Sequence, residues 1–304
     1  MRAVPGQEGL RGLAGILVGG AALESWFTEP KVPLGRWVKI GITWLQDNAA
    51  GFFDAVTALI DFLVDGFTAI LLHIPFLVVV FALAALAYWM HRSWRLAAFV
   101  VIAFIAIANL GYWQATVETI SLVGFATIVS VLIGVPLGIA SAHRPWLYAL
   151  LRPLLDLMQT LPTFVYLIPT LVLFHLGSAP GLISTVIFSI AAPVRLTYLG
   201  IVSAPTPLKE AGEAFGATKR QLLWKVELPY ALPTIMAGIT QCIMLSLSMV
   251  VIAALVGAAG LGVPVVRALG TVNIPMGIEA GVSIVLLAIV LDRVFRNPER
   301  RGSA

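Results

Sequence analysis

Long apolar runs without charge are the feature that most constrains how this chain folds. Several are close to the ~20 residues that a helix needs to cross roughly 30 Å of hydrocarbon. Hydrophobic residues fill 60% of the 304 positions and charged residues only 11%, too few to solvate the surface of a soluble protein of this size. We therefore predict an all-α membrane protein with about seven transmembrane helices, near residues 72–90, 96–112, 116–142, 154–176, 182–198, 233–256 and 277–295.

The joints between these helices differ in charge, and the difference predicts the orientation of the chain. Lys and Arg occur in the joints after the first, third and fifth helices and in the C-terminal tail, whereas residues 111–114 and 177–181 contain neither. Because cytoplasmic joints are enriched in basic residues, the C-terminus is predicted inside and the N-terminus outside. A competing possibility is that residues 10–23 form an eighth span, which would move the N-terminus inside.

The segment before the first predicted span has a pattern of its own. From Arg36 to His73, apolar residues recur at roughly helical spacing and aspartates fall on a different face. This predicts an amphipathic helix in the membrane interface, with Trp37 and Trp44 at headgroup depth. We interpret it as a structural brace rather than a ligand site. The predicted organisation is an external tail at 1–71, a transmembrane domain at 72–295 and a cytoplasmic tail at 296–304.

Several function classes are disfavoured by what the sequence lacks. It has no G-x-x-x-x-G-K-[ST] phosphate cradle, no clustered metal ligands and a single cysteine, Cys242, within a predicted span. The basic residues lie beside the spans, so the net charge of +4 does not indicate nucleic acid binding. We see no carboxylate near a span midplane, which argues against an ion-coupled carrier. An enzyme is not expected, and no cofactor is expected on this chain.

A charged segment between the fifth and sixth predicted spans, residues 205–229, interrupts the apolar pattern. Its prolines break the preceding helix, and residues 208–215 favour a short helix that Gly216 can end with a sharp turn. Thr218 is placed to cap a second helix over residues 219–226, before Leu228-Pro229 redirects the chain into the next span. The charge argument puts this segment on the cytoplasmic side, where a soluble partner can dock.

The spacing within this segment resembles the EAA loop of ATP-binding-cassette (ABC) importer permeases. Glu210-Ala211-Gly212 is followed by Gly216 and then by Val226-Glu-Leu228-Pro229. Gly212 replaces the second Ala of the family pattern, and Val226 replaces Ile. From about residue 110 to residue 293 the sequence is similar to the glycine betaine/proline (quaternary ammonium) permease subfamily, on segments 154–169, 212–229, 241–257 and 260–264.

This resemblance implies a type I ABC importer permease fold and a partner set. Such permeases are homodimers in the bacterial cytoplasmic (inner) membrane, served by two cytoplasmic ATPases, which bind ATP and Mg, and by an external solute-binding protein. The cargo would be a solute such as glycine betaine, proline or choline. The residues implied in ATPase coupling are Glu210, Ala211, Gly212, Glu213, Gly216, Lys219, Arg220, Val226, Leu228 and Pro229.

A translocation path is expected along the fourth and sixth spans. A proline inside a span frees a backbone carbonyl, which is tolerated where it lines a cavity or finds a partner. For each residue, interhelical packing is an equally good interpretation. The candidates are Met158, Gln159, Thr160, Pro162, Thr163 and Tyr166, with Met244, Ser246, Ser248 and Met249.

Other functions remain open at this point. The same permease family carries other amino acids such as histidine. A secondary carrier that acts alone, or a membrane scaffold that recruits a cytosolic partner through the 205–229 segment, would come from different classes. The sequence does not identify the solute.

Overall fold

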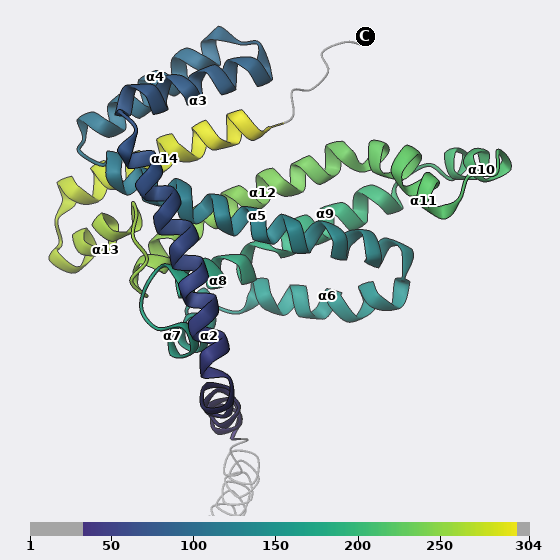
Figure 1. The fold of residues 1–304 in the computed structure, drawn as a ribbon, viewed down its shortest axis with the longest axis horizontal. Helices are drawn as coiled ribbons and strands as arrows, with labels where there is room; N and C mark the ends of the chain where they lie inside the picture. Colours follow the sequence, from purple (N-terminus) through teal and green to yellow (C-terminus); the bar gives the residue numbers. More distant parts are fainter. Residues whose placement is uncertain (1–32, 297–304) are drawn as a thin grey trace, which may run out of the picture. The chain divides into compact units, whose positions relative to one another are not determined.

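The computed structural model describes residues 33–296, and all regular elements in that part are helices (Figure 1). Helix α2, Leu34–His73, contains a non-helical residue at Ala49 (φ −130°, ψ 19°). The chain divides there into two units, residues 1–48 and 49–304. Residues 10–23, the alternative eighth span, and nearly all of the C-terminal tail lie outside the described residues.

Five helices are long and apolar enough to cross a membrane, or six if the bent pair α6–α7 is one span. Helix α2 is among these five, so its composition fits a span as well as the predicted interfacial helix. The helices that follow are α3 Phe76–His91, α4 Trp94–Asn109, α5 Trp113–His143, α6 Pro145–Thr160, α7 Thr163–Phe174, α8 Ser178–Ser189, α9 Ala191–Val202, α10 Thr206–Ala214, α11 Lys219–Leu222, a π-helical turn Leu223–Glu227, α12 Leu228–Ala254, α13 Gly262–Thr271 and α14 Ile274–Phe295.

The first two predicted spans are present as the shorter helices α3 and α4, of 16 residues each. That is fewer than the ~20 residues of a full crossing. The two helices pack on each other and on α14 through a core that includes Val80, Phe104 and Leu287. The His91 ring lies 2.8 Å from the Val294 carbonyl oxygen, so the α3–α4 joint lies beside the C-terminal end of α14.

Helices α5, α8, α9 and α12 form the tightly packed bundle of residues 49–296. Small residues let their backbones approach: a Cβ added at Gly138 of α5 would lie 2.6 Å from Thr197 Cβ of α9. The hydroxyls of Ser130 and Ser189 also meet at 3.0 Å between α5 and α8. Close helix contact, rather than large side chains, therefore defines this bundle.

Two sequence predictions about spans are wrong in detail. The fourth predicted span is bent by 96° between α6 and α7, because Leu161 is extended (φ −63°, ψ 135°) before Pro162. A proline disfavours the helical region for the residue that precedes it. The helix that contains the sixth predicted span begins at Lys219 rather than near residue 233, and it runs without a redirecting break to Ala254.

Candidate functional site

The segment between α9 and α12 has the local geometry that the sequence predicted. Helix α10 ends before Gly216, whose φ of +78° makes the turn. Thr218 then forms a capping box with Gln221: the Gln221 N–H donates to Thr218 Oγ1 at 3.3 Å, and the Thr218 N–H donates to Gln221 Oε1 at 2.8 Å. The predicted helix, turn and cap are confirmed.

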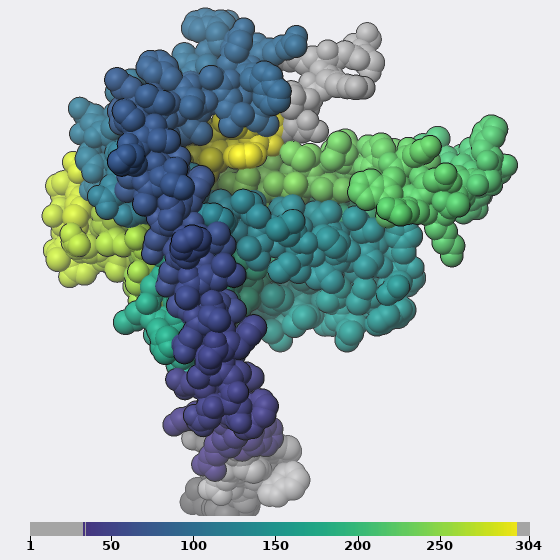
Figure 2. Space-filling view, in the orientation of Figure 1, coloured from purple at the N-terminus to yellow at the C-terminus, as the bar shows by residue number. Residues whose placement is uncertain are grey.

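Helix α10 and the turn after it are exposed, and Figure 2 shows them as a green projection beyond the packed helices. None of the residues of α10 is buried. Phe215, directly before the turn glycine, is 93% exposed, and Leu208 and Trp224 are also exposed. Large apolar side chains on such a projection, outside the apolar spans, make it a candidate surface for binding another protein. Sequence reasoning overlooked Phe215, although an aromatic residue beside a turn glycine in a charged segment was a usable signal.

The predicted coupling residues divide into an exposed group and a packed group. The exposed members are Glu210, Ala211, Glu213, Gly216, Lys219, Arg220 and Pro229. Gly212, Val226 and Leu228 are partly buried, and a Cβ added at Gly212 would lie 2.8 Å from Leu222 Cδ1. The glycine that departs from the family pattern thus lies where α10 packs on α11.

The second helix of this segment continues into α12 through a π-helical turn, contrary to the predicted redirection at Leu228-Pro229. The Leu228 N–H donates to the Leu223 carbonyl five residues back. Pro229 has no N–H to continue an α-helical ladder, and its ring would clash with a carbonyl four residues earlier. The wider π turn accommodates the proline. Residues 219–227 are therefore connected to the bundle by continuous helix, so a movement of these residues would be passed to α12.

A buried carboxylate lies at the base of the segment. Glu227 is 4% exposed, and its Oε2 lies 2.9 Å from His143 Nε2 at the end of α5. Its Oε1 lies 3.5 Å from Lys209 Nζ of α10. Lys209 also donates to the carbonyl of Ile201, in the last turn of α9, at 3.4 Å. Sequence reasoning missed Glu227; the signal was an acidic residue on the apolar face of a helix.

The predicted path residues of α6 and α7 lie around the bend. Thr160 and Pro162 are exposed, Met158, Gln159 and Thr163 are partly buried, and Tyr166 is buried with a hydroxyl that has no hydrogen-bond partner. Helix α6 is held to α9 by the Asp156–Arg195 ion pair at 2.5 Å and by the parallel stack of Tyr148 on Tyr198. A bend with exposed polar groups is consistent with a surface that meets water or a partner.

The path candidates of α12 lie on two different faces. Ser246 and Met249 are buried, whereas Met244 and Ser248 are exposed. Gln241 is exposed on the same face, seven residues before Ser248. A glutamine turned to lipid would leave amide hydrogen bonds unmade, so this face fits a polar path or a second protein chain better. Gln241 is a further residue that sequence reasoning did not select, although its spacing from Ser248 was visible.

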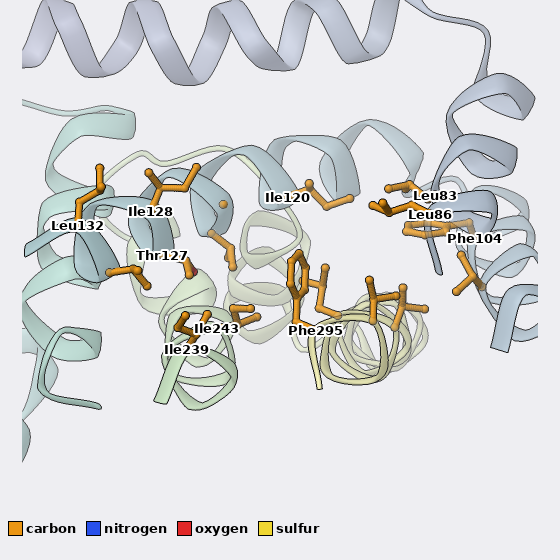
Figure 3. A pocket seen from close by; sticks show the side chains of 17 residues that line it. Leu83, Leu86, Phe104, Ile120, Thr127, Ile128, Leu132, Ile239, Ile243 and Phe295 are labelled. Carbon is orange, nitrogen blue, oxygen red and sulfur yellow. The ribbon is translucent and has the colours of Figure 1, made fainter. Parts of the chain in front are cut away.

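A large apolar cavity lies elsewhere: Figure 3 shows α5 on one side of it, α12 and α14 on the opposite side, and side chains of α3 and α4 at one end. Its volume is about 490 Å³, and Thr127 is the single polar side chain among its lining residues. No predicted path residue lines it. Such a lining offers a zwitterion only the Thr127 hydroxyl in place of water, so the cavity does not fit the expected path.

Metal ligands do not converge in the described part of the chain: residues 33–296 contain no group of three His, Cys, Asp or Glu side chains that could hold a metal ion. The sole cysteine, Cys242, is buried within α12.

Comparisons with known proteins agree with one another. Residues 134–302 match the family described as binding-protein-dependent transport system inner membrane component. The chain is 43% identical to the glycine betaine transport system permease protein OpuAB of Bacillus subtilis, over 90% of this chain and 99% of that protein. It is 41% identical to the glycine betaine/proline betaine transport system permease protein ProW of Escherichia coli, over 91% of this chain and 79% of that protein.

The fold is also similar to a solved transporter structure. The MetNI methionine ABC transporter in an inward-facing conformation matches with a TM-score of 0.54 and 24% identity, over 60% of this chain and 93% of the matched chain. At this identity the likeness speaks for the fold alone. The chain has the type I ABC permease fold and belongs to the inner membrane components of binding-protein-dependent transport systems, so it is a transport permease subunit and not an enzyme.

Proposed function

We propose that this chain carries a small quaternary ammonium or zwitterionic solute of the glycine betaine type into the cell. The observation that carries the proposal is the similarity to glycine betaine permeases over about nine-tenths of the chain. A more distant relative, the trimethylamine N-oxide permease TmoV of Ruegeria pomeroyi, is 35% identical over 73% of this chain and 34% of its own length. The named solutes of these relatives are all small, polar and methylated on nitrogen, which favours this chemistry over histidine.

The 205–229 segment is the site where we place ATPase docking. Exposed Glu210 and Glu213 offer charge, and Phe215 offers an apolar anchor of the kind that dominates binding energy at protein interfaces. The continuous helix from Lys219 to Ala254 joins this site to the bundle. ATP and Mg²⁺ would bind to the partner ATPase and not to this chain.

We further propose that the working permease is a homodimer, with the path between the two copies. The exposed face of α12 with Gln241, Met244 and Ser248 and the bend at Thr160–Pro162 would line this path. Two cytoplasmic ATPases and an external solute-binding protein would complete the transporter. Ser246 and Met249 would support the lining from behind, because they are buried within one copy.

The proposed location is the bacterial inner membrane, with the C-terminus in the cytoplasm and the N-terminus outside. The contact of His143 with Glu227 supports this arrangement, since it places the basic joint after α5 beside the coupling segment. Residues 1–71, 72–295 and 296–304 would then be the external tail, the transport domain and the cytoplasmic tail.

An uptake assay tests the function directly. The permease would be reconstituted in liposomes with its ATPase and binding protein, with sodium and proton gradients collapsed. We expect ATP to drive uptake of labelled glycine betaine, and proline betaine to compete more strongly than histidine. Uptake that required an ion gradient and ignored ATP would contradict the proposal.

A variant pair tests the docking site in the same preparation. Glu210→Lys reverses an exposed charge on α10 and should leave the protein inserted while the ATPase no longer copurifies. Glu279→Lys makes the same change on exposed α14 and should copurify the ATPase normally. Equal ATPase recovery with both variants would refute docking at α10.

A further inference from the structure

At the Glu227 carboxylate, polar side chains from α5, α10 and the π-helical turn meet. Glu227 belongs to the π-helical turn that begins the long α12 helix, and it contacts His143 of α5 and Lys209 of α10. Lys209 reaches on to the Ile201 carbonyl at the end of α9. A cation at a helix C-terminus is favourable, so Lys209 joins α9 and Glu227 at once.

The two hydrogen bonds of His143 fix the orientation of its ring in this cluster. Nδ1 of His143 lies 2.9 Å from the Ile139 carbonyl, which can only accept, so Nδ1 carries a hydrogen. Nε2 faces Glu227 Oε2 at 2.9 Å, and that contact needs one proton between the two atoms. The ring is thus fixed on α5 by one nitrogen and linked to α12 by the other.

Because Glu227 is buried, its carboxylate depends on the partners in this cluster. Glu227 is 4% exposed, whereas the side chains of His143 and Lys209 are 44% and 28% exposed. A carboxylate removed from water requires its charged and hydrogen-bonding partners, and loss of a partner leaves it uncompensated. Ion pairs of this type contribute less to net stability than to fixing one arrangement of the elements that supply them.

We propose that Glu227 is a positioning residue that fixes α10 to the ends of α5 and α9, so that a displacement of α10 by the ATPase moves the bundle. The proposal rests on the proposed docking of the ATPase at α10. Helix α10 otherwise meets the rest of the chain mainly through α11 and the π turn, and none of its residues is buried. Without the Glu227–Lys209 contact, α10 would shift under the ATPase while α5 and α9 stayed in place.

The test uses the whole complex of permease, ATPase and binding protein in liposomes. Glu227→Gln keeps the shape of the side chain and removes its charge, and Lys209→Met removes the partner charge at a half-buried position. We measure ATPase copurification, ATP hydrolysis stimulated by the loaded binding protein, and glycine betaine taken up per ATP hydrolysed. The matched controls are Glu279→Gln, which neutralises an exposed carboxylate on α14, and Arg267→Met, which removes an exposed cation on α13, outside the docking segment.

We expect both test variants to retain the ATPase and to lose uptake per ATP by about tenfold or more, within the usual range of coupling between sites. The double variant should lose less than the product of the two single losses, because both changes remove the same Glu227–Lys209 contact. The controls should behave as the wild type. A purely structural role would instead lower ATPase recovery and thermal stability with an unchanged uptake per ATP.

Two outcomes would overturn the inference: normal uptake per ATP in Glu227→Gln, or losses in the double variant that are the product of the two single losses. If Glu227→Gln does not insert in the membrane, the Lys209→Met variant tests the proposal instead. Wild-type uptake per ATP in that variant would also refute the positioning role of Glu227. Failure of the docking proposal would look different from failure of this inference. In that case Glu210→Lys would recover as much ATPase as the wild type.

Discussion

The bundle of α5, α8, α9 and α12 and the α10–α11 segment use glycine for opposite purposes. In the bundle, glycines such as Gly138 allow helix backbones to touch, and a Cβ there would meet Thr197 and the Val194 carbonyl. In the segment, Gly216 makes a turn at φ +78°, and nothing lies within 4 Å of its added Cβ. The bundle helices are therefore closely packed and suited to move together, whereas the segment leaves its turn open to contact by another protein.

Burial follows the same division. The bundle places small polar side chains such as Ser130 and Ser189 in mutual contact, whereas α10 leaves Glu210 and Glu213 exposed. Glu227 lies at the boundary, buried like the bundle and charged like the segment. The comparison separates a closely packed region from an exposed one, where we propose that the partner binds, with the Glu227 cluster between them.

The largest expected effect comes from disturbing the bundle. Gly138→Ala places a Cβ 2.7 Å from the Val194 backbone oxygen, which cannot move without shifting α9. We expect a loss of about 1–3 kcal/mol in stability from overpacking, seen as a lower thermal unfolding temperature in detergent. Gly124→Ala on the same helix meets nothing within 4 Å and should be neutral or slightly stabilising. Equal unfolding temperatures for both variants would break the comparison.

A smaller effect is expected from the segment, and on binding only. Phe215→Ala removes a side chain that is 93% exposed, so the unfolding temperature of the isolated permease should not change. Affinity for the ATPase should fall by about 1–2 kcal/mol, as for an aromatic side chain that contributes to an interface. Titration of the ATPase onto the reconstituted permease measures this. A stability loss with unchanged affinity would reverse the roles of the two regions.

The smallest effect is expected at Gly212, a glycine of the segment that is packed against a neighbouring side chain as the bundle glycines are. Gly212→Ala restores the residue of the family pattern, and its Cβ would meet only the flexible end of Leu222 at 2.8 Å and Val226 at 3.9 Å. Leu222 can rotate away, and Ala favours the helix by up to about 1 kcal/mol. We expect wild-type uptake and ATPase recovery. Impaired coupling in this variant would show that Gly212 is needed for close packing, as in the bundle.

Sequence patterns predicted what depends on local chemistry. Apolar runs predicted the long helices, and Gly216 and Thr218 predicted the turn and the cap of the coupling segment, because these features are encoded within a few residues. The bend at Pro162 also depends on local sequence, but residues 154–176 are predicted from the sequence as one span that contains this proline. The extended Leu161 before it follows the ordinary restriction on residues that precede proline.

What the sequence could not supply depends on contacts between distant helices. His143 and Glu227 are 84 residues apart, and their contact follows from the packing of α5 beside the start of α12. The division of α12 into a buried face with Ser246 and an exposed face with Ser248 likewise depends on which neighbours cover it. The continuity of α12 through Pro229 required a π turn, which hydropathy patterns do not reveal.

Cysteine labelling tests the central claim, docking of the ATPase on α10, most directly. Cys242 is the single cysteine of the chain and is buried, so Glu213→Cys introduces the accessible thiol. We predict rapid maleimide labelling of this variant in the permease alone and strong protection once the ATPase is bound. Glu279→Cys, exposed on α14, should label at the same rate in both states. Equal labelling of Glu213→Cys with and without bound ATPase would contradict the account.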